Sequence, residues 1–227
     1  MQRWKKRIPD QVGKGGLVDR AEIGALTLQA EREVTFAIDR LVHYAGWCDK
    51  YQQVLGTNNP VAGPYYNFTI PEATGVVAVV CPVSRFGNHS LLPLVSLLAP
   101  AICAGNTAVV LPCESNPIPA CIFAEACATG DLPPGVVNIL TGTREELVSH
   151  IATHRGIDAI HAANVSPEHA RILREGASEN LKRVVVRDLP PGGGTGAGGW
   201  FDAQTCESAW WIEPFVEMKT VWHPSGA

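Results

Sequence analysis

Apolar residues recur at every third or fourth position between Glu31 and Gln53. This spacing predicts one long amphipathic helix that packs by one face. From residue 56 to residue 71, turn residues flank aromatic and β-branched positions, a pattern that indicates a β-hairpin. Residues 1–24, which include the basic run from Arg3 to Arg7, are expected to form a flexible N-terminal segment.

The centre of the chain alternates short apolar runs with helical stretches. Strands are predicted at 75–81, 107–111, 136–140, 157–162 and 184–187, and helices at 91–103, 117–127, 144–152 and 167–177. Strands that are covered on both faces are apolar throughout, and these runs are. The pattern therefore predicts an α/β fold over residues 25–190, a doubly wound, Rossmann-like parallel sheet of five strands with helices on both faces.

Beyond this domain the composition changes twice. Residues 191–208 begin with a glycine-rich run that has too few side chains to bury, so they are expected to form a flexible linker. Residues 209–227 form the tail, and the aromatic and β-branched positions from 210 to 222 predict an extended strand that needs a partner sheet. That partner is either the early hairpin or another subunit. Exposing Trp210, Trp211, Phe215 and Trp222 to water would be costly, so we expect a subunit contact rather than a ligand cage.

Charge and cysteine usage narrow the functional classes. The net charge of −4, from 18 basic and 22 acidic residues, makes nucleic acid an unexpected partner. No apolar run is long enough to span a membrane, and the seven cysteines lie mostly within apolar runs, which suits reduced core thiols in the cytoplasm. His150 and His154 have a spacing that can bind a metal, but surface histidines at a helix end are commoner, and no metal site is predicted.

Three blocks of residues follow one another in a recognisable order. They read GVVAVVCP at 75–82, LLAPAICAGNTAVV at 97–110 and DLPPGVVNILTG at 131–142. The chain closely resembles the aldehyde dehydrogenase superfamily over about residues 25–190, and VEMKTVW at 216–222 resembles that family's closing oligomerisation strand. The resemblance implies a nucleotide-binding part, for NAD or NADP, joined to an oligomerisation tail. It is greatest to the degenerate C-terminal module of the two-module aldehyde dehydrogenases of family 16.

The resemblance also implies that the catalytic groups are missing. Family members carry a nucleophilic cysteine in a Gly-Gln-x-Cys context within a catalytic domain, and here only the glycine-rich linker stands in that place. The thioester chemistry needs that thiolate and a carboxylate base. The position of the base corresponds to Arg187, and an arginine cannot accept a proton at ordinary pH. We therefore predict no catalytic residues and no dehydrogenase activity of the chain alone.

Cofactor contacts implied by the resemblance are only partly retained. The family's Pro-Trp-Asn-Phe-Pro loop corresponds to residues 82–88, and Ser84 in this segment is a candidate cofactor contact. Asn88 could replace the family's oxyanion asparagine only if the loop folded back. The ribose-binding Lys-Pro-Ser-Glu corresponds to 111–114, so Pro112 and Glu114 are retained. The helix start that receives the pyrophosphate corresponds to 162–167, where Val165 and Pro167 remove space and one donor. There Ser166 is predicted to cap a helix that starts at Pro167.

Three hypotheses follow. The first is a non-catalytic structural module that forms a homo-oligomer, or docks against an active aldehyde dehydrogenase subunit, through its C-terminal tail. The second is a residual NAD(P)-binding module that supports an active aldehyde dehydrogenase in the same oligomer or parent protein. A third, an independent dehydrogenase, would need a nucleophile from a partner chain.

Overall fold

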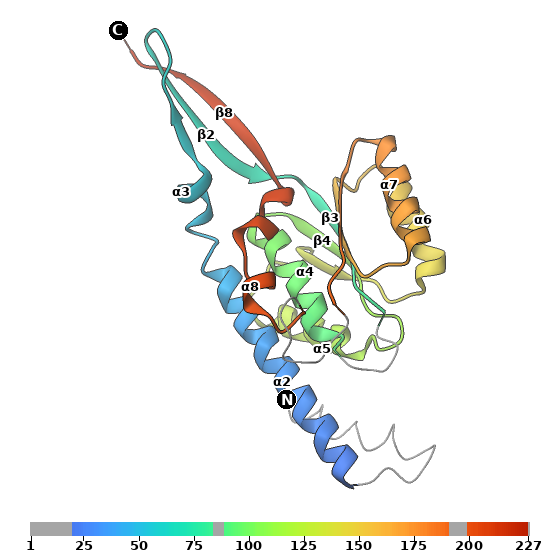
Figure 1. The fold of residues 1–227 in the computed structure, drawn as a ribbon. Coiled ribbons are helices and arrows are strands. Elements are labelled where there is room, and N and C mark those ends of the chain that lie inside the picture. The colour runs from blue at the N-terminus through green and yellow to red at the C-terminus, as the bar shows by residue number, and fades with distance from the viewer. Residues whose placement is uncertain (1–19, 84–88, 191–198, 227) are drawn as a thin grey trace.

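The chain folds into an α/β body from which a narrow β-arm projects (Figure 1). The computed structural model describes residues 20–83, 89–190 and 199–226. The C-terminus lies at the tip of the arm, far from the start of the first described helix.

The body is built on a parallel sheet of five strands, in the order β5-β4-β3-β6-β7. The strands are β3 (Val76–Val80), β4 (Thr107–Leu111), β5 (Val137–Ile139), β6 (Ala159–Ala163) and β7 (Arg183–Arg187). The first strand of this sheet, β3, lies in its middle. The next two, β4 and β5, extend the sheet to one edge, and β6 and β7 then extend it to the other edge. The predicted doubly wound, Rossmann-like sheet is thereby confirmed.

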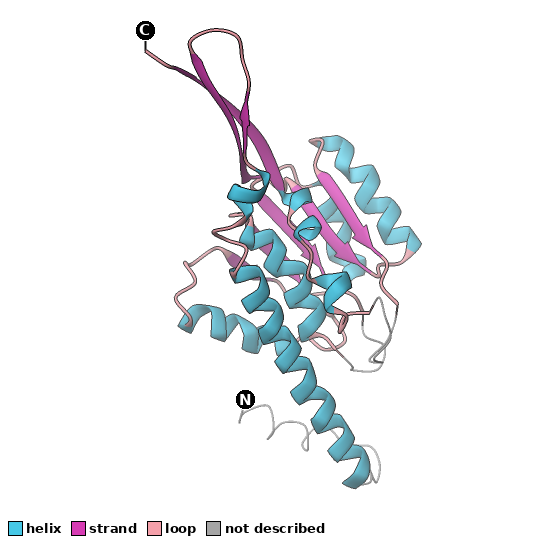
Figure 2. Cartoon of the chain, turned by 60° about the vertical axis from the view of Figure 1, so that its left-hand side comes forward, coloured by secondary structure: helices cyan, strands magenta, loops and turns pink. Residues whose placement is uncertain are grey.

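Helices cover both faces of this sheet (Figure 2). On one face lie α2 (Arg20–Ala45), α4 (Leu91–Cys103) and α5 (Ile118–Thr129), and on the other α6 (Arg144–Thr153) and α7 (Pro167–Gly176). Successive residues of β3 alternate between the two apolar cores: Val77 and Val79 join the first, and Ala78 and Val80 the second. Both sets are fully buried, which explains why the strand is apolar at every position.

The arm is a separate antiparallel sheet of three strands in the order β1-β2-β8. It pairs β1 (Thr57–Asn59) with β2 (Tyr65–Ala73), and β2 with β8 (Val216–Pro224) over its whole length. The predicted hairpin is confirmed, and the tail strand finds its partner in that hairpin within the same chain. This pairing joins segments more than a hundred residues apart in sequence.

Several predicted boundaries are wrong. The helix predicted over 31–53 begins earlier, at Arg20, and α2 ends at Ala45; a turn then separates it from α3 (Tyr51–Leu55). Residues 20–24 are thus helical rather than part of a flexible segment. The tail strand starts at Val216, because short 3-10 turns, η2 (Ala209–Trp211) and η3 (Glu213–Phe215), precede it.

The second half of the predicted linker is also part of the body. Residues 191–198 lie outside the described part of the chain, but from Gly199 onward the segment packs on the α2 and α4 side of the sheet and forms the short helix α8 (Ala203–Cys206). Trp200 and Phe201 are buried. The free energy gained by burying their two rings exceeds the entropy cost of ordering a segment that follows a glycine-rich run. Tyr44 of α2 donates to the Cys206 carbonyl at 2.8 Å and holds the segment in place.

Arg40 is the central polar anchor of this packing. Its side chain is fully buried, and its guanidinium donates to Ser96 Oγ at 2.8 Å, to the Trp200 carbonyl at 3.2 Å and to Glu207 at 3.1 Å. Planar, multi-donor geometry lets one arginine satisfy three acceptors at once. It thereby joins α2, α4 and the C-terminal segment.

Candidate functional site

The candidate site lies where the strand order of the central sheet reverses, between β3 and β6. In doubly wound sheets, ligands bind outside the carboxyl ends of the strands at this point. Residues 81–83 follow β3, residues 112–114 follow β4 and residues 164–167 follow β6. The structure therefore brings the retained part of each predicted cofactor segment to one edge of the sheet. Ser84 and Asn88 lie outside the described residues.

Glu114 has a partner in the fold at this edge. Its Oε2 accepts from the backbone N–H of Arg144 at 2.8 Å, so the carboxylate satisfies a free donor in the first turn of α6. The residue remains exposed to solvent, whereas the neighbouring Pro112 is buried. Of the predicted contacts, Glu114 thus stays reachable from outside, with one oxygen engaged by the helix.

Arg144 is a residue at this edge that the sequence pattern did not single out. Its side chain is 3% exposed and donates to the carbonyl of Cys81, the residue that follows β3. Burial lowers the pKa of Arg144, although the nearby Glu114 carboxylate opposes that shift. Arg144 is the first residue of a polar helix, and nothing in the neighbouring sequence predicts that its side chain is buried. A buried guanidinium beneath the end of β3 thus belongs to the candidate site.

The start of α7 has the predicted helix cap. Ser166 is the N-cap, and its hydroxyl accepts from the His169 N–H at 3.1 Å, with Pro167 at the first helical position. Asn164, just ahead, has a φ of +48° and exchanges two hydrogen bonds with the backbone of Leu189, at 2.7 and 2.9 Å. The Ser166 hydroxyl thus occupies one backbone N–H in the first turn of α7, and the Asn164 contacts link the ends of β6 and β7.

Arg187, at the position predicted for the family base, is partly buried and contacts two buried residues. Its Nε donates to His161 Nε2 at 2.7 Å, and its guanidinium lies 3.9 Å from the ring centre of Trp211. His161 is fully buried; its Nδ1 lies 2.9 Å from the Leu97 carbonyl, so the proton sits on Nδ1. Burial lowers the pKa of Arg187. The cluster provides a cation, and no carboxylate, where the resemblance implies a general base.

The thiols do not supply a nucleophile at this edge. Cys81 is the cysteine directly after β3, and burial raises its pKa to about 12, so it is protonated at neutral pH. Cys113 is likewise buried. The expectation that the thiols are core residues is wrong for Cys48 and Cys121, which are exposed. Within the described ranges, no three histidine, cysteine or acidic side chains come together in a way that could hold a metal.

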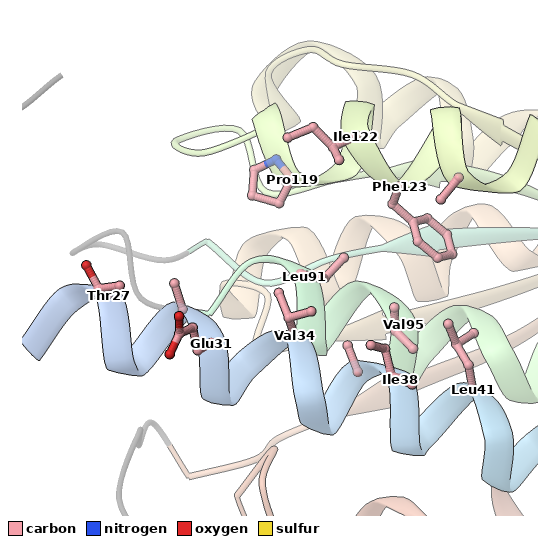
Figure 3. Close-up of a pocket in the computed structure, with 13 residues that line it drawn as sticks. Thr27, Glu31, Val34, Ile38, Leu41, Leu91, Val95, Pro119, Ile122 and Phe123 are labelled. Atoms are coloured by element: carbon pink, nitrogen blue, oxygen red, sulfur yellow. The ribbon is translucent and has the colours of Figure 1, made fainter. Parts of the chain in front are cut away.

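Apart from this edge, a hollow lies where α2, α4 and α5 meet (Figure 3). It has a volume of about 350 Å³. Its lining is apolar, including Val34, Ile38 and Leu41 of α2, Val95 of α4, and Ile122 and Phe123 of α5. Thr27 and Glu31 contribute the polar groups at one end. This lining suits apolar contact rather than acid–base or nucleophilic chemistry.

A family comparison accounts for the fold just described. The model of the aldehyde dehydrogenase family matches residues 1–188, starting ahead of the domain boundary predicted at residue 25. The chain belongs to the aldehyde dehydrogenase family. Retinal dehydrogenase 2 of Taeniopygia guttata is 40% identical over 150 residues, which make up 66% of this chain and 28% of that protein.

Solved structures of aldehyde dehydrogenases have the same fold. A putative aldehyde dehydrogenase from Burkholderia cenocepacia superposes with a TM-score of 0.62 at 28% identity, covering 70% of this chain and 31% of the other. The NAD+ complex of aldehyde dehydrogenase from Bacillus cereus gives a TM-score of 0.62 at 25% identity, with the same coverage. The chain thus spans less than a third of the length of these relatives.

Proposed function

We propose that this chain is a non-catalytic structural module of the aldehyde dehydrogenase family, of the kind represented by the C-terminal module of family 16. The observation that carries the proposal is the position of Arg187. The side chain that stands in for the general base donates to His161 and stacks on Trp211. A guanidinium is already protonated, so it cannot take up the proton that thioester hydrolysis releases.

The C-terminal segment supports the same proposal. Residues 199–215 pack beside α2 and α4 through Arg40, Tyr44 and Trp211. They lead directly into β8 of the arm. The module is therefore built to connect the nucleotide-binding fold with the arm.

The arm offers the surface through which the module would join a partner. β8 is an edge strand of its sheet, and the large exposed side chains of the arm include Tyr65, Tyr66, Met218 and Trp222. An unpaired edge beside exposed aromatic rings favours pairing with another chain. We propose a second copy of this chain, or an active aldehyde dehydrogenase subunit, as the partner. The chain's negative charge disfavours nucleic acid.

The proposed location is the cytoplasm. All seven cysteines are free thiols, and such thiols persist in a reducing compartment. Among the described helices, none combines the length and the apolar character needed to cross a bilayer.

A second candidate function is residual NAD(P) binding. It is favoured by Glu114 and Pro112 at the carboxyl edge of the sheet and by the fold shared with a family member in complex with NAD+. Against it, Leu111 cannot donate to a ribose hydroxyl, and Ser166 already accepts one N–H at the start of α7. The loss of one buried polar anchor costs about 1–3 kcal/mol, up to roughly a hundredfold in affinity.

Calorimetric titration separates the two candidates. NAD and NADP are titrated separately into the folded chain, whose assembly is measured by size exclusion with light scattering on the same sample. The structural module predicts a folded oligomer and no binding up to millimolar cofactor. Micromolar binding that Glu114→Gln weakens would instead establish the cofactor-binding function. A folded monomer would count against the proposed arm interface.

A further inference from the structure

Two thiols far apart in sequence meet at the surface of the body. Cys48 Sγ and Cys103 Sγ are 3.8 Å apart, although 55 positions separate the residues. Cys48 lies in the turn after α2 and is exposed, whereas Cys103 is the last residue of α4 and is partly buried. The pair joins the turn after α2 to the end of α4, outside the carboxyl edge of the sheet and outside the β-arm.

We propose that Cys48 and Cys103 form a reversible disulfide when the chain meets a hydroperoxide. A disulfide has a sulfur separation of roughly 2.05 Å, so the two sulfurs must approach from their present 3.8 Å. Cys48 belongs to a short turn rather than to a helix, which allows its side chain to rotate toward the end of α4.

The two thiols differ in a way that assigns their roles. Burial, together with the neighbouring Cys48, raises the pKa of Cys103 to about 12, so Cys103 remains protonated at neutral pH. Cys48 is exposed to a dissolved oxidant. Susceptibility to oxidation follows thiolate character and exposure, so Cys48 reacts first and Cys103 resolves the product.

The chemistry balances as a two-electron oxidation. The Cys48 thiolate attacks the terminal oxygen of the hydroperoxide, the O–O bond breaks, and an alcohol leaves with one proton. The resulting sulfenic acid is attacked by Cys103, the S–O bond breaks, and the hydroxyl leaves as water with the Cys103 proton. Two thiols and one hydroperoxide thus become one disulfide, one alcohol and one water. Dithiol reductants reverse the product.

The location gives the bond a mechanical consequence. The turn that carries Cys48 leads through α3 into β1 and β2, whereas Cys103 belongs to the helix packed on the central sheet. The disulfide would fasten the base of the arm to the body. Closing a loop of 55 positions removes chain entropy from the unfolded state, and the expected rise in Tm is on the order of 5 °C.

The test uses the full chain, fully reduced and then exposed to tert-butyl hydroperoxide under native conditions. After remaining thiols are blocked, intact mass and peptide mapping are expected to show the loss of two hydrogens and a Cys48–Cys103 crosslink that dithiothreitol reverses. Cys48→Ser is expected to abolish both the crosslink and the rise in Tm. Cys121→Ser, at an exposed thiol on α5, is the matched control and keeps both.

Three results would overturn the proposal. They are over-oxidation of Cys48 to a sulfinic acid with no crosslink, a crosslink that survives Cys48→Ser, and disulfides that join different chains. Because Cys103 is partly buried, Cys48→Ser is the deciding variant, and circular dichroism verifies that it is folded. The outcome is independent of cofactor binding, so it does not depend on the function proposed above.

Discussion

At position 187 a guanidinium stands where the family resemblance implies a carboxylate. Its contacts with His161 and Trp211 give Arg187 a structural role. Replacing Arg187 by Met removes the donor that satisfies the fully buried His161 Nε2. An unsatisfied buried acceptor costs about 1–3 kcal/mol, so the urea midpoint is expected to fall correspondingly. Arg171→Met is the control, because Arg171 pairs with Glu175 at the surface and is expected to change stability by less than about 0.5 kcal/mol. Equal midpoints for the two variants would contradict the structural role of Arg187.

His161 makes the stability of the body dependent on pH. Burial, and then the nearby Arg187, hold the pKa of His161 well below its ordinary value. Above about pH 7.5 neither the folded nor the unfolded state is protonated at this residue. As the pH falls through about 6.5, the unfolded chain binds a proton that the folded chain cannot, so the free energy of unfolding falls by up to about 1.4 kcal/mol per pH unit.

Urea unfolding at about pH 7.5 and pH 5.5 measures this loss. Glutamine can still donate to Leu97 and accept from Arg187, so His161→Gln is expected to show a smaller loss of stability at acid pH than the wild type. His150→Gln, at an exposed position on α6, is expected to keep the wild-type loss. Identical losses in all three proteins would show that other groups govern the acid transition.

At the scale of the elements, the arm depends on a strand that arrives from the far end of the chain. β8 pairs with β2 over nine positions, whereas β1 covers only three. A two-stranded hairpin is marginal in water, so deletion of residues 217–227 is expected to speed amide exchange in β2 by at least about tenfold. β3 and β4, in the other sheet, serve as the internal control and keep their protection. Unchanged exchange in β2 would mean that the hairpin is stable alone.

At the scale of the whole molecule, assembly is expected to depend on the arm. Trp222 is 59% exposed on β8 and lies edge-on to Tyr65, while Trp210 is 72% exposed on η2, away from the arm. Aromatic side chains dominate interface energetics, so Trp222→Ser is expected to weaken self-association by at least about tenfold in sedimentation velocity. Trp210→Ser removes a ring that is even more exposed and is expected to leave association unchanged. Similar weakening by both variants would remove the arm as the specific interface.

Local patterns in the sequence predicted most of the body. The predicted limits of α4 and β4 agree with the structure at both ends, since a continuous apolar run bounded by turn residues marks a buried element. The cap at Ser166 followed from the same local chemistry. The ordered motif blocks likewise led to the family and to Pro112 and Glu114 at the carboxyl edge. Each of these inferences depends on residues adjacent in the chain.

Only the tertiary structure decided which polar residues are buried and where the C-terminal segment lies. Arg144 and Arg187 look like ordinary helix and strand ends, but Arg144 is buried beside Cys81 and Arg187 is partly buried against Trp211, and both partners come from other elements. The glycine-rich composition predicted a linker, but Trp200 and Phe201 bury their rings against the core that α2 and α4 help to form. The sequence by itself determined the elements and the family, because propensity and periodicity act locally. The buried contacts were decided by the fold, because their free energy arises between residues far apart in the chain.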